Sequence, residues 1–156
     1  MTNNTRQPIA EFLYQIEHLD SPLLLATFPS SYAILNPNQP APITGCCMLI
    51  PKVIVPSPNE LTHQDRAQFF LEMTILGDAI MEATGSLRVN YLVLCNQAPE
   101  LHGHCIPRFE TEEPTRRKQC PFTAYDFAHS RPSAPRGQDQ ELVTRLQQAL
   151  RTRLSE

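Results

Sequence analysis

The longest predicted element is a helix over residues 62–84, near the middle of the 156-residue chain. Thr62 and Asp65, three residues apart, form an approximate capping box that marks its start, and Gly85 is well placed to end it. Apolar residues recur at helical spacing along one face: Phe69, Met73, Leu76 and Ile80. A helix of this length must bury that face, so the rest of the chain has to supply a large apolar surface.

Short apolar runs on both sides of the helix predict β-strands. They cover residues 23–28, 32–35, 46–50, 89–95 and 101–106. One further helix begins at Pro8 and ends before Asp20, and a last one runs from about Leu142 to Leu154. The stretch 36–44 is predicted to be a proline-rich loop, and residues 109–136 an irregular polar segment.

This order of elements predicts an α+β fold with a single antiparallel sheet, a long helix and a C-terminal helix. The length suits one domain over residues 1–156, and 41% hydrophobic with 19% charged residues is ordinary globular composition. The formal charge of −3 argues against a protein that binds nucleic acid along its backbone.

No stretch approaches the roughly 20 apolar residues of a membrane span, and the polar N-terminus lacks the apolar core of a signal peptide. The five cysteines are odd in number and lie mostly in apolar runs. They are typical of buried thiols in a reducing compartment, so we expect a cytoplasmic protein without contact to membranes.

Chemistry concentrates in the segment Glu100-Leu101-His102-Gly103-His104. Side chains alternate faces along a strand, so Glu100, His102 and His104 are expected to point the same way. Such a row suits phosphoryl chemistry: a neutral imidazole attacks phosphorus while a second, cationic one neutralises the oxygens or donates a proton. Gly103 and Cys105 face the other side, where small residues allow a helix to approach closely.

Residues 96–108, Asn-Gln-Ala-Pro-Glu-Leu-His-Gly-His-Cys-Ile-Pro-Arg, resemble the signature of the histidine-triad family. That signature has three histidines at alternate positions and Pro-Arg three residues after the last. The register makes Glu100 the first triad position, His102 the middle and His104 the third. The resemblance implies that His102 is the nucleophile, forming a covalent nucleotidyl-histidine intermediate, with His104 as the second catalytic residue.

The resemblance extends upstream through residues 32–36 and 45–52, and covers roughly residues 20–115. By position, Asn36 matches a ribose-binding residue and Asn96 an amide that contacts phosphate. The resemblance also implies a homodimer whose sheets join across the interface. Residues 116–156 form a C-terminal tail and helix outside it.

Three more residues are predicted to contribute to substrate binding. Leu35 belongs to an apolar slot for the base near Leu24 and Leu49. Arg108 either binds phosphate or pairs with Glu110 or Glu112. Glu100 is expected to turn its side chain to a backbone amide or to Arg108, while its carbonyl fixes the His102 tautomer.

The chain departs from the family pattern beyond Glu100, since Cys46 and Val53 stand where histidines are frequent. The leading prediction is a nucleotidyl hydrolase or transferase that cleaves a nucleotide phosphoanhydride, phosphoramidate or phosphoester, with no cofactor or metal. One alternative is a zinc or iron site built from Glu100, His102 and His104. The other is a nucleotide-binding protein that has lost catalysis. His63 and His129 are expected to be solvent-exposed, and His18 to lie near the end of the first helix, where a cation is favourable.

Overall fold

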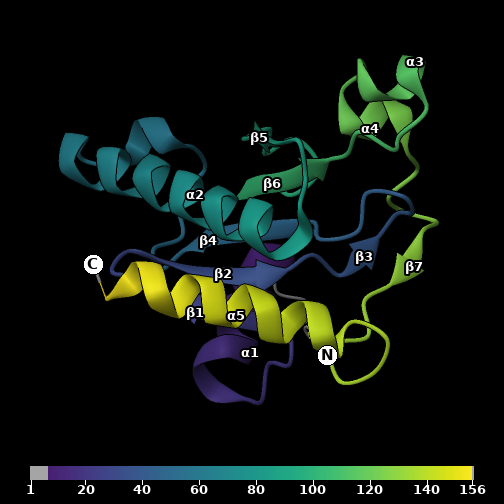
Figure 1. Ribbon diagram of the computed structural model, residues 1–156. Coiled ribbons are helices and arrows are strands. Elements are labelled where there is room, and N and C mark those ends of the chain that lie inside the picture. The colour runs from purple at the N-terminus through teal and green to yellow at the C-terminus, as the bar shows by residue number, and fades with distance from the viewer. Residues whose placement is uncertain (1–6, 156) are drawn as a thin grey trace, which may run out of the picture.

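The computed structural model describes residues 7–155. The chain has the predicted α+β architecture (Figure 1). Its helices are α1 (Pro8–His18), the 3₁₀ helix η1 (Pro58–Glu60), α2 (His63–Thr84), α3 (Pro114–Arg117), α4 (Pro121–Ala124) and α5 (Gln140–Leu154). Its strands are β1 (Leu24–Thr27), β2 (Ser31–Leu35), β3 (Asn38–Gln39), β4 (Cys47–Pro51), β5 (Arg88–Leu92), β6 (Gly103–Arg108) and β7 (Arg131–Pro132).

The main sheet is antiparallel throughout, with strand order β1-β2-β4-β6-β5. A separate two-stranded pair joins β3, within the predicted loop 36–44, to β7 in the predicted irregular segment. The prediction of a single sheet is therefore correct for the main strands and misses this small pair. No helix within residues 7–155 has the length and apolar character needed to cross a membrane.

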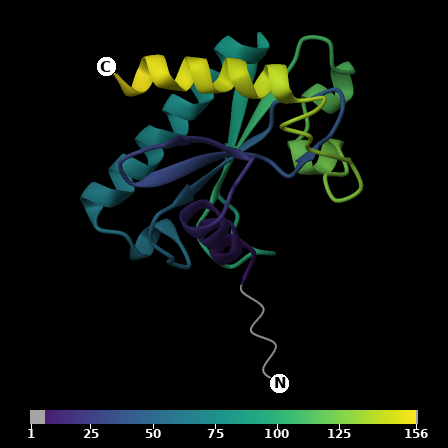
Figure 2. The same cartoon turned by 90° about the horizontal axis from the view of Figure 1, so that it is seen from below.

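The two faces of the main sheet are covered by different elements. One face, which includes Leu35, Leu49 and Cys105, packs against α2 and α5 in the largest hydrophobic core. The other face, which includes Ile34 and Met48, packs against α1. Figure 2 shows α1 in front of the strands when the molecule is seen from below. The functional histidines belong to this second face, because His104 pairs in register with Met48.

Helix α2 forms as its sequence predicts. The Thr62 hydroxyl accepts a hydrogen bond from the Asp65 amide at 3.1 Å, and Gly85 ends the helix in the left-handed conformation with φ of 69°. The predicted apolar face is buried at all four positions. Gly103 allows α2 to approach, because a Cβ there would lie 2.8 Å from the Met73 side chain. This confirms the predicted role of a small residue beside the catalytic segment.

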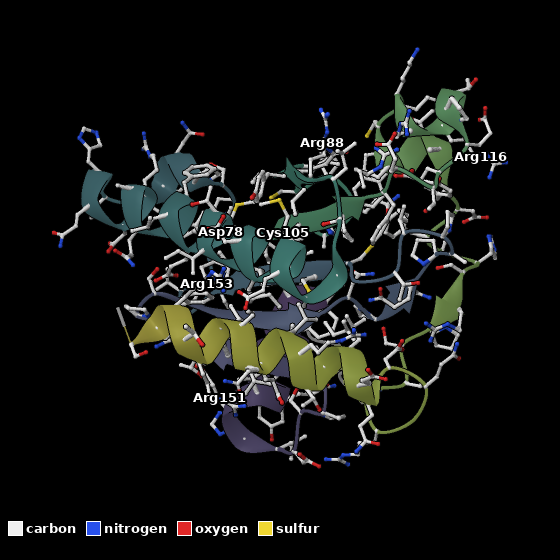
Figure 3. All side chains as sticks on the ribbon, in the orientation of Figure 1. Asp78, Arg88, Cys105, Arg116, Arg151 and Arg153 are labelled. Carbon is white, nitrogen blue, oxygen red and sulfur yellow. The ribbon has the colours of Figure 1, made fainter. Side chains whose placement is uncertain are left out.

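The segment 109–136 is more ordered than its composition predicts. Two short helices start with Pro114 and Pro121, whose fixed φ suits the first turn of a helix. Figure 1 shows α3 and α4 together at one end of the sheet, beyond β6. In Figure 3 Arg116 marks this end of the sheet at the upper right, whereas Arg151 and Arg153 of α5 lie on the left of the view, away from it. The segment ends in β7, which pairs with β3, and its residues 122–128 line the cavity described below.

Candidate functional site

Two histidine rings stand together where the chain enters β6. His104 is the second residue of the strand, and His102 lies just before it, so the strand begins two residues later than predicted. The ring centroids are 5.0 Å apart and the planes meet at 81°. Their common orientation follows from the alternation of side chains along extended backbone, as the sequence predicts.

The carbonyl oxygen of Glu100 orients the His102 ring. It lies 2.7 Å from Nδ1 of His102. A carbonyl oxygen can only accept, so Nδ1–H is the donor and, in the neutral ring, Nε2 carries the free lone pair. The ring is 6% exposed, so it has little freedom to turn away. The predicted use of the Glu100 carbonyl is therefore confirmed.

The Glu100 carboxylate points away from the histidines. It accepts a hydrogen bond from the Ala10 amide at 2.9 Å, in the first turn of α1. A negative charge is favourable there, because the first amides of a helix have no partners within the helix and the helix dipole is positive at that end. Of the predicted orientations, the structure shows the one toward a backbone amide. The carboxylate is thus engaged at the start of α1, and Glu100 is not among the residues that line the cavity over His102.

His104 is electrically neutral at physiological pH in this environment. Burial, and secondarily the neighbouring His102, lowers the pKa of His104 to about 4. The protein alone therefore does not supply the cationic second imidazole that the sequence analysis expects. A bound phosphate would carry negative charge next to the ring and would raise this pKa again.

A cavity of about 690 Å³ opens over the two histidines, a volume typical of small-molecule sites. Its walls come from four parts of the chain: residues 36–38, 94–98, 102–104 and 122–128. The predicted ribose and phosphate residues, Asn36 and Asn96, line it together with His102 and His104. The loop after β5 contributes Leu94 and Cys95, and the segment 122–128 forms the facing wall. The structure thus brings four of the seven predicted site residues to one cavity.

Three predicted substrate-binding residues lie outside the cavity lining. Glu100 is bound to α1 through Ala10. Leu35 and Leu49 are fully buried on the α2 side of the sheet. Leu24 packs on the α1 side, so the three residues of the predicted apolar slot lie on opposite faces of the sheet and form no common slot. The reason is the sheet register, which places Leu35 opposite Cys47 and therefore on the face away from His104.

Arg108 is the third of these residues, and the structure assigns it to Glu112. Its guanidinium donates to the Glu112 carboxylate at 2.9 Å and to the Gln119 carbonyl at 2.7 Å. It is 2% exposed, so its donors are used within the protein rather than presented to a phosphate. Burial opposes ionisation of Glu112, but hydrogen bonds from Arg108, the Phe109 amide and Tyr125 lower its pKa. Pairing with Glu112 is the second of the two predicted roles of Arg108.

The sequence interpretation misses the aromatic wall of the cavity. Phe122 meets His104 edge-on, with centroids 5.0 Å apart, and Phe127 meets Phe122 at 4.7 Å. The five-residue spacing of these phenylalanines between polar residues carries no recognised motif. The clearest local signals were the Glu113-Pro114 and Cys120-Pro121 pairs, which are typical of helix starts. Cys95 also lines the cavity, with an unusual positive φ of 53°.

The remaining histidines lie at the surface. His63 and His129 are exposed as predicted, and His18 is exposed in the last turn of α1. His129 pairs with Asp126 at 2.7 Å, which lowers the pKa of that carboxyl. The three-ligand metal site is not assembled, because Glu100 is held by Ala10. Across residues 7–155 no three His, Cys, Asp or Glu side chains are grouped so that they could hold a metal ion.

Comparison with solved structures identifies the fold. A histidine triad protein from Sinorhizobium meliloti superposes with a TM-score of 0.66 at 20% identity, over 81% of this chain and 88% of that one. A hypothetical histidine triad nucleotide-binding protein from Sulfolobus tokodaii gives 0.68 at 17%, over 91% and 92%. A zinc-bound histidine triad family protein from Mycobacterium smegmatis gives 0.68 at 14%, over 93% and 95%.

Neither the protein-family models nor the curated proteins contain a match to the sequence. The similarity is therefore one of three-dimensional structure. The fold implied by the residues around His102 and His104 is confirmed: the chain has the histidine-triad fold.

Proposed function

We propose that this protein is a nucleotidyl hydrolase or transferase, in which His102 attacks the α-phosphorus of a nucleotide phosphoramidate, phosphoanhydride or phosphoester. The observation that carries the proposal is the 2.7 Å hydrogen bond from Nδ1 of His102 to the Glu100 carbonyl. It makes Nε2 the nucleophilic atom of a neutral imidazole, which is the form that the reaction requires. The cavity over His102 has space for a nucleotide.

In the first step Nε2 forms an N–P bond while the bond from phosphorus to the leaving group breaks with its electron pair. The leaving group takes up a proton from His104, which the bound phosphate keeps protonated, and Nδ1–H continues to donate to the Glu100 carbonyl as the His102 ring becomes positively charged. In the second step water or another acceptor attacks phosphorus and passes its proton to His104, and the N–P bond breaks with its electron pair returning to Nε2 of His102. The Glu100 carbonyl favours both steps because it stabilises the positively charged ring.

His104 and the two asparagines supply the polar surroundings of the phosphate. A phosphate in the cavity would raise the pKa of His104, so the ring would take up a proton where negative charge is present. Asn96 and Asn36 line the same cavity and would bind phosphate and ribose. The Asn36 amide nitrogen donates to the Asn38 carbonyl at 2.7 Å, which leaves its side-chain oxygen available.

The test is capture of the intermediate. Adenosine 5′-phosphoramidate is mixed with the protein, and the products are followed by phosphorus-31 NMR and by intact mass after rapid quenching. We expect release of adenosine 5′-monophosphate and an adenylyl group on His102. The alternative of a protein that binds nucleotides without catalysis predicts binding of the monophosphate with no turnover.

We also propose that the protein works as a homodimer joined along β5. This strand is one edge of the main sheet, and its Tyr91 is 42% exposed. Phe70 is exposed to the same extent, and it lies two helical turns before Gly77, which faces Tyr91, so it is on the β5 side of α2. A second copy pairing β5 with β5 would satisfy the free edge and cover these side chains.

A further inference from the structure

We infer that the segment 121–128 forms a subsite for a planar aromatic ring of the substrate, and that Arg108 and Glu112 hold this subsite against the catalytic strand. The inference rests on the proposed function for the identity of the substrate. Its physical basis is independent of catalysis. It consists of three observations: the position of Phe122 and Phe127, the packing of α1 over the neighbouring part of the sheet face, and the buried Arg108–Glu112 ion pair behind the segment.

The sheet face beside the histidines offers little other apolar surface to a ring. Ile34 and Met48 share this face with His104, but Ile9 and Leu13 of α1 pack against them. Ile34 is fully buried and Met48 is 5% exposed. The predicted slot around Leu35 and Leu49 is on the opposite face. A ring attached to a phosphate at His102 must therefore make its apolar contacts outside the part of the sheet that α1 covers.

The segment after β6 supplies that partner. Phe122 and Phe127 both line the cavity and are both only half-buried, so part of each ring faces its interior. Phe122 meets His104 with ring centroids 5.0 Å apart, and the His104 centroid is itself 5.0 Å from that of His102, so the wall begins beside the proposed reacting centre. Phenylalanine faces bind planar rings by stacking and edge contacts, whereas a sugar or phosphate gains little from them.

The wall is fixed from behind by a buried network. The Tyr125 hydroxyl donates to the Glu112 carboxylate at 2.7 Å, and Arg108 donates to the same carboxylate. Arg108 also binds the carbonyls of Gln119 and Arg116. Because Arg108 ends β6 and Tyr125 follows α4, the network ties the wall to the strand that carries His104. Arg108 and Glu112 are thus positioning residues for the ring subsite.

Titration calorimetry on the full chain tests the subsite without needing turnover. Adenosine 5′-monophosphate and ribose 5-phosphate differ only by the base. We expect the monophosphate to bind about tenfold more tightly or better, in line with stacking of one base on an aromatic side chain. In Phe122→Leu and in Phe127→Leu this ratio should fall below about threefold, with ribose 5-phosphate binding unchanged.

A second arm asks whether the ring belongs to the base or to the leaving group. In His102→Asn protein, where turnover cannot interfere, ribose 5-phosphate is compared with its N-(indolylethyl)amide, which has an aromatic leaving group and no base. A preference for the amide that the Phe127→Leu substitution removes assigns the subsite to the leaving group. A base preference that the same substitution removes assigns it to the base. Either result supports the subsite.

Two matched variants separate this inference from its competitors. Phe12→Leu changes a half-buried phenylalanine of α1 outside the cavity lining and should leave both ratios unchanged. If Phe12→Leu lowers them while Phe122→Leu and Phe127→Leu do not, the ring lies against α1 and the inference is overturned. Tyr125→Phe keeps the ring and removes only the hydroxyl that holds the wall. It should weaken ring binding about threefold or more, whereas no change would remove the positioning role.

The two proposals fail separately. Ring-dependent binding without an adenylyl intermediate would overturn the proposed function and keep the subsite. Turnover through an adenylyl intermediate, with binding ratios that neither Phe122→Leu nor Phe127→Leu changes, would support the proposed function and overturn the subsite.

Discussion

The carbonyl oxygen of Glu100 lies 2.7 Å from Nδ1 of His102, while the carboxylate of the same residue accepts from Ala10 of α1 at 2.9 Å. One residue therefore orients the His102 ring through its backbone and contacts α1 through its side chain. In the proposed reaction this division of roles keeps the orienting contact on the backbone and engages the carboxylate at the start of α1.

His102→Asn should lower turnover at least about a thousandfold, equal to about 4 kcal/mol of transition-state stabilisation, because the covalent step loses its nucleophile. The free energy of unfolding should change by about 1 kcal/mol or less, since one hydrogen bond to Glu100 is at stake. Steady-state kinetics and urea denaturation measure the two effects. His129→Asn, which alters an exposed histidine outside the cavity, is the control. Loss of activity in His104→Ala with a tenth retained in His102→Ala would reverse the assignment of the nucleophile.

Glu100→Gln should keep turnover within about tenfold, because the backbone carbonyl that orients His102 is unchanged. The substitution leaves an oxygen that can accept from Ala10 but removes a negative charge at the start of α1. We expect a loss of about 0.5–1 kcal/mol in the free energy of unfolding. Steady-state kinetics and urea denaturation measure the two effects here as well. A hundredfold loss of turnover with unchanged stability would show that the carboxyl acts in the chemistry.

Arg108→Met should destabilise the protein strongly, by about 3–5 kcal/mol in urea denaturation, because the Glu112 carboxylate would remain buried without its cation. Arg108→Met combined with Glu112→Leu should recover much of that loss, since neither charge is then buried alone. Arg117→Met is the matched control, as Arg117 pairs with Glu110 at the surface. Equal stability of the single and double variants would contradict an ion pair that acts as a unit.

The sequence is informative where local rules coincide with tertiary structure. Helix α2 is recognisable because capping at Thr62, the apolar face and Gly85 agree. The spacing of His104 and Pro107-Arg108 is specific enough to indicate the histidine-triad fold, which the solved structures confirm. The orientation of Glu100 could also be predicted from the sequence, because its backbone carbonyl can orient His102 while its side chain turns to another partner.

Other features depend on contacts that no local pattern contains. Leu35 looks like a pocket residue until the register with Cys47 places it on the α2 face. The segment after Arg108 looks irregular because its order comes from a buried carboxylate, Glu112, bound by residues up to 13 positions away. The neutrality of His104 likewise comes from burial beneath Phe122, and polar composition cannot predict that burial.

Acid should destabilise this protein partly through His104. Its pKa of about 4 in the folded state lies below the ordinary value of 6.5, so the unfolded chain binds a proton first as the pH falls. The stability associated with the neutral ring is present above pH 6.5 and is lost as the pH falls toward 4. The loss amounts to about 3 kcal/mol. Urea denaturation at pH 7, 5.5 and 4 should therefore show a shallower decline in His104→Gln than in wild type. His129→Gln, with its exposed ring, should follow wild type, and parallel curves for all three proteins would refute the shift.

The proposed dimer predicts a solution mass of twice 17.7 kDa by light scattering or sedimentation. Phe70→Glu should shift the protein to monomers, because the new carboxylates would be buried at the interface beside the partner's copy without cations. Leu19→Glu is the matched control, since Leu19 is 58% exposed and follows α1, on the opposite face of the sheet from α2. It should leave the mass unchanged. If turnover persists in the Phe70→Glu monomer, the cavity is complete within one chain, as its lining residues suggest. A wild-type mass near 17.7 kDa at micromolar concentration would instead mean that the free edge of β5 and the apolar side chains near it serve another partner.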